Sequence, residues 1–249
     1  MQYGICNLSI VPVRIQPADA SEMVTQLLYG EYFKVLEERG KWSRIRIAFD
    51  SYEGWIDNRQ YIKVEESVYY DLSSEVRKYS ADLIEFITDE SEGLTTIALG
   101  SVLNSNGPLK NTFDGSSISG VKEKPNLVNT ALLYLNAPYM WGGKTPFGID
   151  CSGLTQMVYM LNGHSLLRDA SQQATQGEAL SFIEESEPGD LAFFDNDEGK
   201  ITHVGIIMHD NYIIHVNGKV RIDRIDHSGI FNTELKRHTH QLRVIKKII

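Results

Sequence analysis

The sequence predicts an α+β domain, helices packed on an antiparallel sheet, preceded by small all-β barrels. Two observations carry this prediction. The first sixty or so residues hold short strand-like segments separated by turns, whereas after about residue 125 helical periodicity comes first and strand-like runs follow. We therefore divide the 249-residue chain into residues 1–64, 65–120 and 121–249.

Residues 1–64 predict one small barrel. Pro12 lies in the first strand-like segment and makes a central position in a sheet unfavourable, because proline has no N–H to donate. Residues 37–41 form a polar hairpin tip. The predicted strands cover residues 8–15, 26–31, 32–36, 42–47 and 51–56.

Residues 65–120 predict a second, degenerate barrel followed by a linker. A short helix is expected between residues 65 and 87, and a strand over 95–103. Residues 104–108 have the composition of a turn, and the Gly- and Ser-rich run 114–120 that of a linker.

Residues 121–249 begin with two predicted helices. The first covers 127–135, and the second starts at Cys151, with apolar residues at Leu154, Met157, Val158 and Leu161. Asp150 is the expected N-cap, and Asn162-Gly163 the stop signal. A thiol in the first helical turn is expected to have a lowered pKa, because the positive end of the helix dipole favours the thiolate.

A predicted hairpin supplies two histidines. Residues 202–208 and 212–216 flank a three-residue turn, so opposite residues sum to 420 and His203 lies diagonal to His215 on the same face. Further strands are expected at 191–194 and 242–245. A lone histidine among Ile, Val and Met is most often a hydrogen-bonded core residue, but two beside a helix-capping cysteine favour chemistry.

Nucleophilic cysteine catalysis needs a thiolate, a base and a group that orients the base. Cys151, His203 and His215 supply these types. A zinc site is the rival use of one cysteine and two histidines, but no further ligand stands at motif spacing, so we expect neither metal nor cofactor. The remaining histidines are expected at the surface: His164, His209, His227, His238 and His240.

Composition excludes several partners. The net charge of −9, without a Lys/Arg cluster, argues against nucleic acid and mildly favours a cationic or amine-bearing ligand. Two distant cysteines are expected to be reduced. Neither a signal peptide nor a membrane-spanning run is recognisable, so a cytoplasmic location is expected unless an export signal was removed; a periplasmic or secreted location is the alternative.

Four sequence blocks point to a family. They are Tyr139-x-Trp141-Gly142-Gly143, residues 150–154 (Asp-Cys-Ser-Gly-Leu), residues 188–194 (Pro-Gly-Asp-Leu-x-Phe-Phe) and residues 202–206 (Thr-His-Val-Gly-Ile). Together they resemble the NlpC-type papain-like cysteine peptidases of bacterial cell-wall metabolism. Residues 28–31, 40–42 and 52–56 resemble the bacterial SH3-like domains found beside cell-wall enzymes.

The resemblance implies a papain-like fold and cleavage of γ-D-glutamyl-L-diamino acid bonds in peptidoglycan stem peptides. It implies Cys151 as nucleophile, His203 as general base and acid, and His215 as the residue that orients His203. Tyr139 and the Cys151 backbone N–H would stabilise the oxyanion.

With its SH3-like start, the chain more closely resembles the cytoplasmic recycling enzymes that release L-Ala-γ-D-Glu from free muropeptides with an unblocked L-Ala. Five residues are then expected to contact substrate: Asp150, Ser152, Asp169, Glu31 and Tyr52. For each of them helix capping or surface polarity is the competing interpretation. Two functions stay open beside this one: an exported hydrolase whose SH3-like domains bind the wall, and another amidase or an acyltransferase on the same fold.

Overall fold

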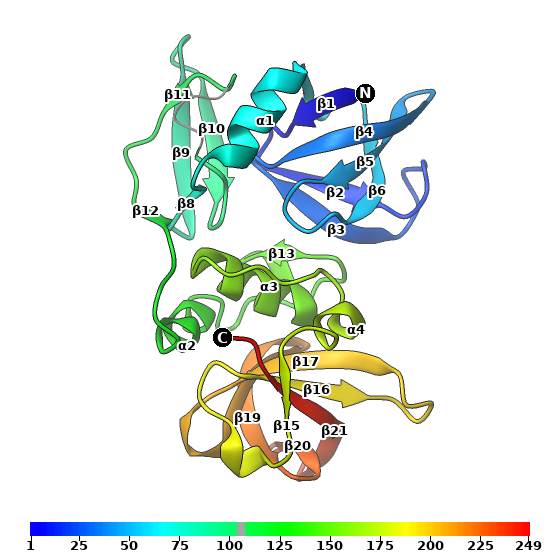
Figure 1. Cartoon of the computed structure of the whole chain (residues 1–249), viewed down its shortest axis with the longest axis vertical. Helices are drawn as coiled ribbons and strands as arrows, with labels where there is room; N and C mark the ends of the chain where they lie inside the picture. The colour runs from blue at the N-terminus through cyan, green and yellow to red at the C-terminus, as the bar shows by residue number, and fades with distance from the viewer. Residues whose placement is uncertain (104–107) are drawn as a thin grey trace. The chain divides into compact units, whose positions relative to one another are not determined.

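The structure is a computed structural model that describes residues 1–103 and 108–249. It forms two compact units (Figure 1), and the first is Met1–Gly120 together with Trp141–Thr145. The second comprises Val121–Met140 and Pro146–Ile249. The chain thus returns to the first unit for five residues shortly before Cys151.

The first unit contains a seven-stranded antiparallel sheet with the order β3-β2-β6-β5-β4-β1-β7. Its inner face packs Phe33, Ile45 and Ile56 into a buried apolar core with Cys6. Alternation of apolar and polar residues along β4 and β5 places one side of each strand in this core. The strands are β1 (Gln2–Ile5), β2 (Ile10–Arg14), β3 (Met23–Leu28), β4 (Tyr32–Arg39), β5 (Trp42–Ile47), β6 (Glu53–Asp57) and β7 (Ile62–Val64).

Pro12 lies in an interior strand, contrary to the expectation, because β2 stands between β3 and β6 in the sheet. Strand β2 pairs with β3 along its length but with β6 only at Arg14, so Pro12 is not required to donate to a second neighbour. The strands β1 and β7, which were not predicted, extend the sheet beyond β4.

Residues 65–120 add a helix and two small sheets to the first unit. Helix α1 (Glu66–Ser74) packs Tyr69 and Leu72 against Tyr3 and Tyr32. Part of the predicted linker is a strand, because β12 (Ser117–Ser119) pairs with β8 (Lys78–Ser80). The turn predicted at 104–108 lies mostly outside the described residues. The other sheet has the order β10-β9-β11, from β9 (Ile84–Asp89), β10 (Leu94–Ala98) and β11 (Asn111–Thr112).

The helices of the second unit follow the prediction. Helix α2 (Asn126–Leu132) and helix α3 (Cys151–Leu161) were both expected, and Asn162 closes α3 before Gly163, whose φ is 83°. A short helix α4 (Ala170–Gln173) and a 3-10 turn η1 (Ile183–Glu185) were not predicted. Two short strands precede α3 in the chain: β13 (Lys144–Thr145), which belongs to the first unit, and β14 (Gly148–Ile149), which belongs to the second.

The strands of the second unit close into a six-stranded barrel, because β20 pairs with both β19 and β21. The sequence predicted an antiparallel sheet but neither its closure nor strands β19 and β20. Figure 1 shows these strands together below α3. They are β15 (Glu178–Leu180, outside the closed ring), β16 (Leu191–Asp195), β17 (Ile201–Ile207), β18 (Tyr212–Asn217), β19 (Lys219–Asp226), β20 (Gly229–Asn232) and β21 (Arg237–Lys247).

Helix α3 is buried along almost its entire length, from Ser152 to Leu161. It contacts strands β17 and β18, which carry the two predicted histidines. The barrel interior is filled by Phe194, Ile213 and Ile230 among others. Among the described residues, no helix is long and apolar enough to cross a membrane.

Candidate active site

Cys151 is the first residue of α3, as the sequence predicted. Asp150 has an extended backbone (φ −96°, ψ 176°), and its Oδ1 accepts a hydrogen bond of 2.6 Å from the backbone N–H of Gly153. This is the geometry of a side-chain N-cap, which satisfies one of the free N–H groups of the first turn. The cap therefore fixes the position of the thiol at the start of the helix.

The expected lowering of the Cys151 pKa is wrong for this structure. Burial, followed by the negative charge of Asp150, raises the pKa of the thiol to about 12. Hydrogen bonds from the backbone N–H groups of Val204 and Ser152 act in the opposite direction but do not outweigh burial. Cys151 keeps part of its surface exposed, and the upward shift of its pKa favours the thiol over the thiolate at neutral pH.

The two predicted histidines are brought together. Gly205 lies opposite His215, so the predicted register is confirmed, and His203 reaches His215 diagonally. His203 Nε2 and His215 Nδ1 are 2.9 Å apart, and both side chains are buried. Glycine at 205 leaves room for this contact, since a Cβ there would lie 2.7 Å from Ile213 Cδ1 and 3.0 Å from His215 Cβ and would force one of them to shift.

The hydrogen-bonded chain continues to residues that the sequence analysis missed. His215 Nε2 lies 3.0 Å from Asp223 Oδ2 on β19. Arg221 donates to both carboxylate oxygens of Asp223, at 2.7 Å and 3.0 Å. Asn217-Gly218 was the available signal, because this pair predicts a tight turn that would return Asp223 to the face of His215.

Burial governs the charge of this group. It lowers the pKa of His203 well below its usual value, and the nearby His215 and His240 lower it further. Burial also lowers the pKa of His215, against the opposing effect of its hydrogen bond to Asp223. Burial would raise the pKa of Asp223, but hydrogen bonds from His215 and Arg221 lower it overall. Both imidazoles are consequently neutral at pH 7, and the carboxylate is ionised.

Two histidines expected at the surface are not exposed. His240 is half-buried and stacks on His203, with ring centroids 4.2 Å apart and an interplanar angle of 25°. Burial lowers the pKa of His240 to about 4. His164 is half-buried against Tyr159, which it meets edge to face. The prediction failed because closure of the barrel carries β21 back to β16, beside β17, an arrangement that local polarity does not reveal. His209, His227 and His238 are exposed as predicted.

Three histidines are the residues closest to a metal-binding arrangement in the described part of the chain. Ring nitrogens of His203, His215 and His240 all lie within 4.8 Å of one another. Both nitrogens of His215, however, already meet His203 and Asp223, and the rings of His203 and His240 are stacked. A metal ion would have to displace these contacts, so the arrangement suits proton transfer better than coordination.

Tyr139 lies near the thiol. Its backbone forms an isolated parallel β-bridge with Ile149, two residues before Cys151, and the residue is 44% exposed. Burial raises the pKa of its hydroxyl, and the charges that Cys151 and Asp150 carry when ionised add to this effect. The hydroxyl is therefore a neutral donor in the neighbourhood of Cys151.

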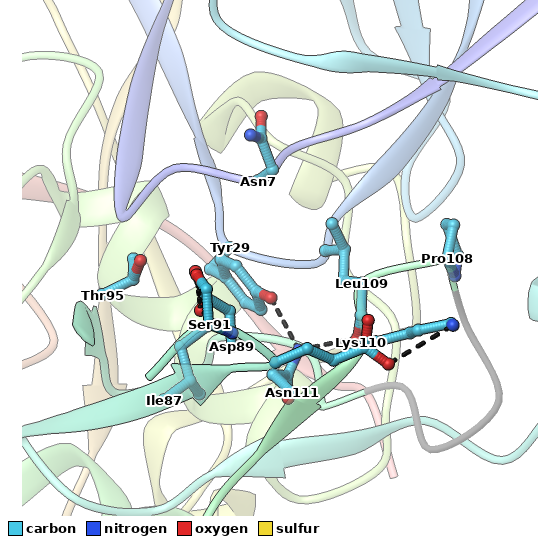
Figure 2. Close-up of a pocket in the computed structure, with 11 residues that line it drawn as sticks. Asn7, Tyr29, Ile87, Asp89, Ser91, Thr95, Pro108, Leu109, Lys110 and Asn111 are labelled. Atoms are coloured by element: carbon cyan, nitrogen blue, oxygen red, sulfur yellow. Dashed lines mark hydrogen bonds and ion pairs between the residues drawn. The ribbon is translucent and has the colours of Figure 1, made fainter. Parts of the chain in front are cut away.

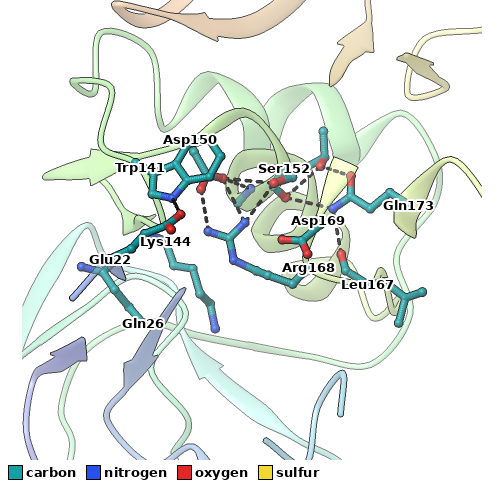
Figure 3. Close-up of polar contacts among 12 residues, drawn as sticks. Glu22, Gln26, Trp141, Lys144, Asp150, Ser152, Leu167, Arg168, Asp169 and Gln173 are labelled. Carbon is teal, nitrogen blue, oxygen red and sulfur yellow. Dashed lines mark hydrogen bonds and ion pairs between the residues drawn. The ribbon is translucent and has the colours of Figure 1, made fainter. Parts of the chain in front are cut away.

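Asp150 and Ser152 are held by an arginine that the sequence analysis missed (Figure 3). Arg168 is buried, and its guanidinium donates to Asp150 Oδ1 at 3.0 Å, to Asp150 Oδ2 at 2.7 Å and to Ser152 Oγ at 2.9 Å. A bidentate pair of this kind fixes both direction and distance. The two residues beside Cys151 are thus oriented by one buried cation.

Asp169, next along the chain, is half-buried at the start of α4. Its backbone N–H donates to Gln172 Oε1 at 3.1 Å. Gln173 of the same helix donates to the carbonyl oxygen of Ser152 at 3.0 Å, so α4 is tied to the first turn of α3. A role of Asp169 in substrate binding stays a prediction.

The remaining two predicted contacts, Glu31 and Tyr52, belong to the first unit. Glu31 is buried and forms a 2.9 Å ion pair with Lys144, while its other oxygen accepts from the Leu28 N–H. Tyr52 packs half-buried against the apolar core of the sheet. Trp141 of the same unit donates to Glu22 at 2.6 Å (Figure 3). A role of Glu31 and Tyr52 in binding substrate stays a prediction.

The described residues also line two hollows. One of about 500 Å³ lies in the first unit, where Asn111 donates to Tyr29 Oη at 2.7 Å (Figure 2). The other, of about 770 Å³, lies in the second unit and is lined by His240, Thr202 and Asp195. It adjoins the histidine group, since His240 stacks on His203.

A helix-capped cysteine, a neutral histidine and a second residue that orients the histidine are the parts of a cysteine hydrolase. Comparison with known proteins gives the family. Residues 136–242 match the NlpC/P60 family, and residues 13–60 match the bacterial dipeptidyl-peptidase SH3 domain. The chain thus carries an NlpC/P60 cysteine peptidase domain together with a bacterial SH3 domain.

Curated relatives cover most of the chain. A gamma-D-glutamyl-L-lysine dipeptidyl-peptidase of Bacillus cereus is 29% identical over 79% of this chain and 68% of its own length. The enzyme of the same description from Bacillus subtilis is 28% identical over 77% and 71%. Dipeptidyl-peptidase 6 of Lysinibacillus sphaericus is 26% identical over 85% and 87%.

Solved structures share the fold. An NlpC/P60 family protein of Bacillus cereus superposes with a TM-score of 0.81 over 99% of both chains, at 19% identity. An NlpC/P60 endopeptidase of Photobacterium damselae gives a TM-score of 0.73 over 97% of this chain and 70% of that one, at 17% identity. At these identities the likeness concerns the fold alone.

Proposed function

We propose that this peptidase hydrolyses the γ-D-glutamyl-L-diamino acid bond of peptidoglycan stem peptides. The observation that carries the proposal is the 2.9 Å contact between His203 and His215. His203 lies on β17 next to Val204, whose N–H donates to the Cys151 sulfur. The descriptions of the relatives supply the bond, since two of them are gamma-D-glutamyl-L-lysine dipeptidyl-peptidases.

Acyl transfer through Cys151 is the proposed reaction. The Cys151 sulfur attacks the γ-carbonyl carbon of D-Glu, and its proton passes to His203. The carbonyl electrons move to oxygen, which accepts from the Tyr139 hydroxyl and the Cys151 N–H. The tetrahedral intermediate collapses, the C–N bond breaks, and His203 protonates the leaving amine. Water, deprotonated by His203, then hydrolyses the thioester.

The uncharged states of the Cys151 thiol and the His203 imidazole determine when the proton moves in this reaction. Because the thiol has a raised pKa and His203 a lowered one, proton transfer accompanies attack instead of preceding it. His203 must therefore carry a positive charge only while the tetrahedral intermediate is formed. His215 orients its ring throughout.

Substrate contacts are proposed on both sides of the nucleophile. Asp150 and Ser152, held by Arg168, would contact the D-Glu moiety, and Asp169 the amine of L-Ala. Glu31 and Tyr52 are proposed to add to amine recognition. For Glu31 this requires its carboxylate to accept from the substrate ammonium as well as from Lys144.

A free N-terminal L-Ala is the proposed requirement, which favours soluble muropeptides as substrates and a cytoplasmic enzyme. The second candidate is an exported hydrolase of polymeric peptidoglycan. A stretch of 105 residues also matches a probable endopeptidase p60 of Listeria welshimeri, at 39% identity over 41% of this chain and 20% of that protein.

One assay series tests the proposal. The protein is incubated with L-Ala-γ-D-Glu-L-Lys, its diaminopimelate analogue and the N-acetylated tripeptide, and the products are identified by mass spectrometry. We expect L-Ala-D-Glu to be released from the free tripeptides at least tenfold faster than from the blocked one. Equal cleavage of the blocked peptide, or cleavage of purified sacculi alone, would support the exported hydrolase instead.

A further inference from the structure

We propose that Asp223 is a positioning residue that sets the tautomers of both histidines and so leaves the Nδ1 lone pair of His203 as the base for Cys151. The inference deepens the proposed function and rests on the role given there to His203. Its starting point is the hydrogen-bonded order His203, His215, Asp223, Arg221, which runs from β17 through β18 to β19.

Asp223 can only accept hydrogen bonds in this position. Its carboxylate is buried, and Arg221 donates to each of its oxygens. A guanidinium holding both oxygens keeps the carboxylate ionised and leaves it no proton to offer. The third group at Asp223 Oδ2, the His215 Nε2, must then be the donor.

The proton on His215 Nε2 determines the tautomers of both imidazole rings. A neutral imidazole carries one N–H, so His215 Nδ1 is left with a lone pair and accepts a hydrogen bond. Its partner at 2.9 Å is His203 Nε2, which must carry the proton of that ring. His203 Nδ1 is consequently the unprotonated nitrogen, and it is available as the base for the thiol of Cys151.

Groups from two strands face the two imidazoles, namely Asp223 and Arg221 on β19 and His240 on β21. Cys151 begins α3, and its sulfur accepts from the N–H of Val204, the residue after His203. His240 stacks on His203 with a ring that burial keeps neutral, so it does not compete with Asp223 for the imidazole proton. Asp223 is then the negative charge that the His203 imidazolium experiences, through His215, when the Cys151 proton arrives.

The Asp223→Asn variant keeps the shape of the side chain but removes the carboxylate. An asparagine amide can turn its Nδ2 toward His215 Nε2, which forces the proton of His215 to Nδ1 and that of His203 to Nδ1 as well. His203 Nδ1 is then protonated and cannot act as the base for Cys151. We expect kcat to fall by roughly 10²–10⁴-fold, with KM changed less than about threefold, because Asp223 touches no substrate.

The tautomers are read directly by ¹⁵N NMR of the histidine side chains. The wild-type protein is labelled at histidine, and His203→Gln and His215→Gln variants assign the two rings. We expect protonated Nε2 and bare Nδ1 on both rings in the wild-type protein, and a reversed or mixed pattern in Asp223→Asn. Asp226→Asn is the matched control, because Asp226 on the same strand pairs with His238 at the surface; it should keep kcat within about twofold.

A wild-type spectrum with the proton on His203 Nδ1, or a folded Asp223→Asn variant with wild-type kcat, would overturn the inference. If Asp223→Asn does not fold, the wild-type spectrum alone decides. The spectrum requires no substrate, so a protein that cleaves none of the tested peptides yet shows the expected tautomers would contradict the proposed function and leave this inference standing.

Discussion

Two buried polar networks flank the cysteine segment, and they differ in whether their protons can move. Arg168 binds Asp150 and Ser152 with charges that stay fixed, because an arginine does not release its proton in a protein. His203 and His215 form a chain of neutral rings whose protons can shift. The first network is suited to holding position and the second to transferring a proton, although both are equally buried.

The largest effect on kcat is expected from a substitution of Cys151, the proposed nucleophile. Replacing Cys151 by alanine removes the nucleophile but leaves the Asp150 cap and both networks in place. We expect kcat to fall by about 10⁴-fold or more, with the free energy of unfolding nearly unchanged. Steady-state cleavage of L-Ala-γ-D-Glu-L-Lys measures the first quantity and urea unfolding the second. Substantial turnover by the variant would remove Cys151 from the mechanism.

The fixed-charge network is tested by Arg168→Met, which keeps much of the side-chain volume. It leaves the Asp150 carboxylate buried without its cation, so we expect a loss of about 3–5 kcal/mol in the free energy of unfolding. Lys200→Met is the matched control, because Lys200 pairs with Glu198 at the surface; its effect should stay within about 0.5 kcal/mol. Equal stability of the two variants would show that the buried pair is not structural.

The proton network is tested by two replacements of His215. Alanine leaves the His203 ring without an orienting partner, and we expect kcat to fall by roughly 10²-fold. Glutamine offers a carbonyl to His203 and an N–H to Asp223, so it should recover at least tenfold of that loss. The comparison is made by steady-state kinetics at one pH. Identical rates for the two variants would contradict the orienting role.

The smallest effect is expected in the pH dependence of the wild-type enzyme. Hydrolysis needs neutral His203, and burial holds the pKa of this ring well below its usual value, so the acid limb of kcat/KM should lie below about pH 6.5. Because the Cys151 pKa is raised to about 12, the profile should show no alkaline limb up to about pH 9. A fall in rate between pH 8 and 9 would indicate a thiolate–imidazolium pair instead.

Local patterns in the sequence were sufficient for the centre of the site. The Asp150 cap, the start of α3 and the register between His203 and His215 all depend on residues close together in the chain. Helical periodicity and a three-residue turn specify them without knowledge of the rest of the fold.

The surroundings of the site could not be predicted in the same way. Asp223 and His240 reach the histidines only because β19 and β21 belong to a closed barrel, and Arg168 comes from an irregular segment after α3. The sign of the Cys151 pKa shift failed for the same reason: the helix start is visible in the sequence, whereas the burial that outweighs it is a tertiary property.

The most direct test of the account is to trap the acyl-enzyme. The protein is mixed with L-Ala-γ-D-Glu-L-Lys, quenched in acid and digested, and its two cysteines are compared by mass spectrometry. We predict that Cys151 carries one L-Ala-D-Glu acyl group and that Cys6, a fully buried thiol in the first unit, carries none. Cleavage of the tripeptide without any acyl group on Cys151, under conditions that trap a thioester, would contradict the account.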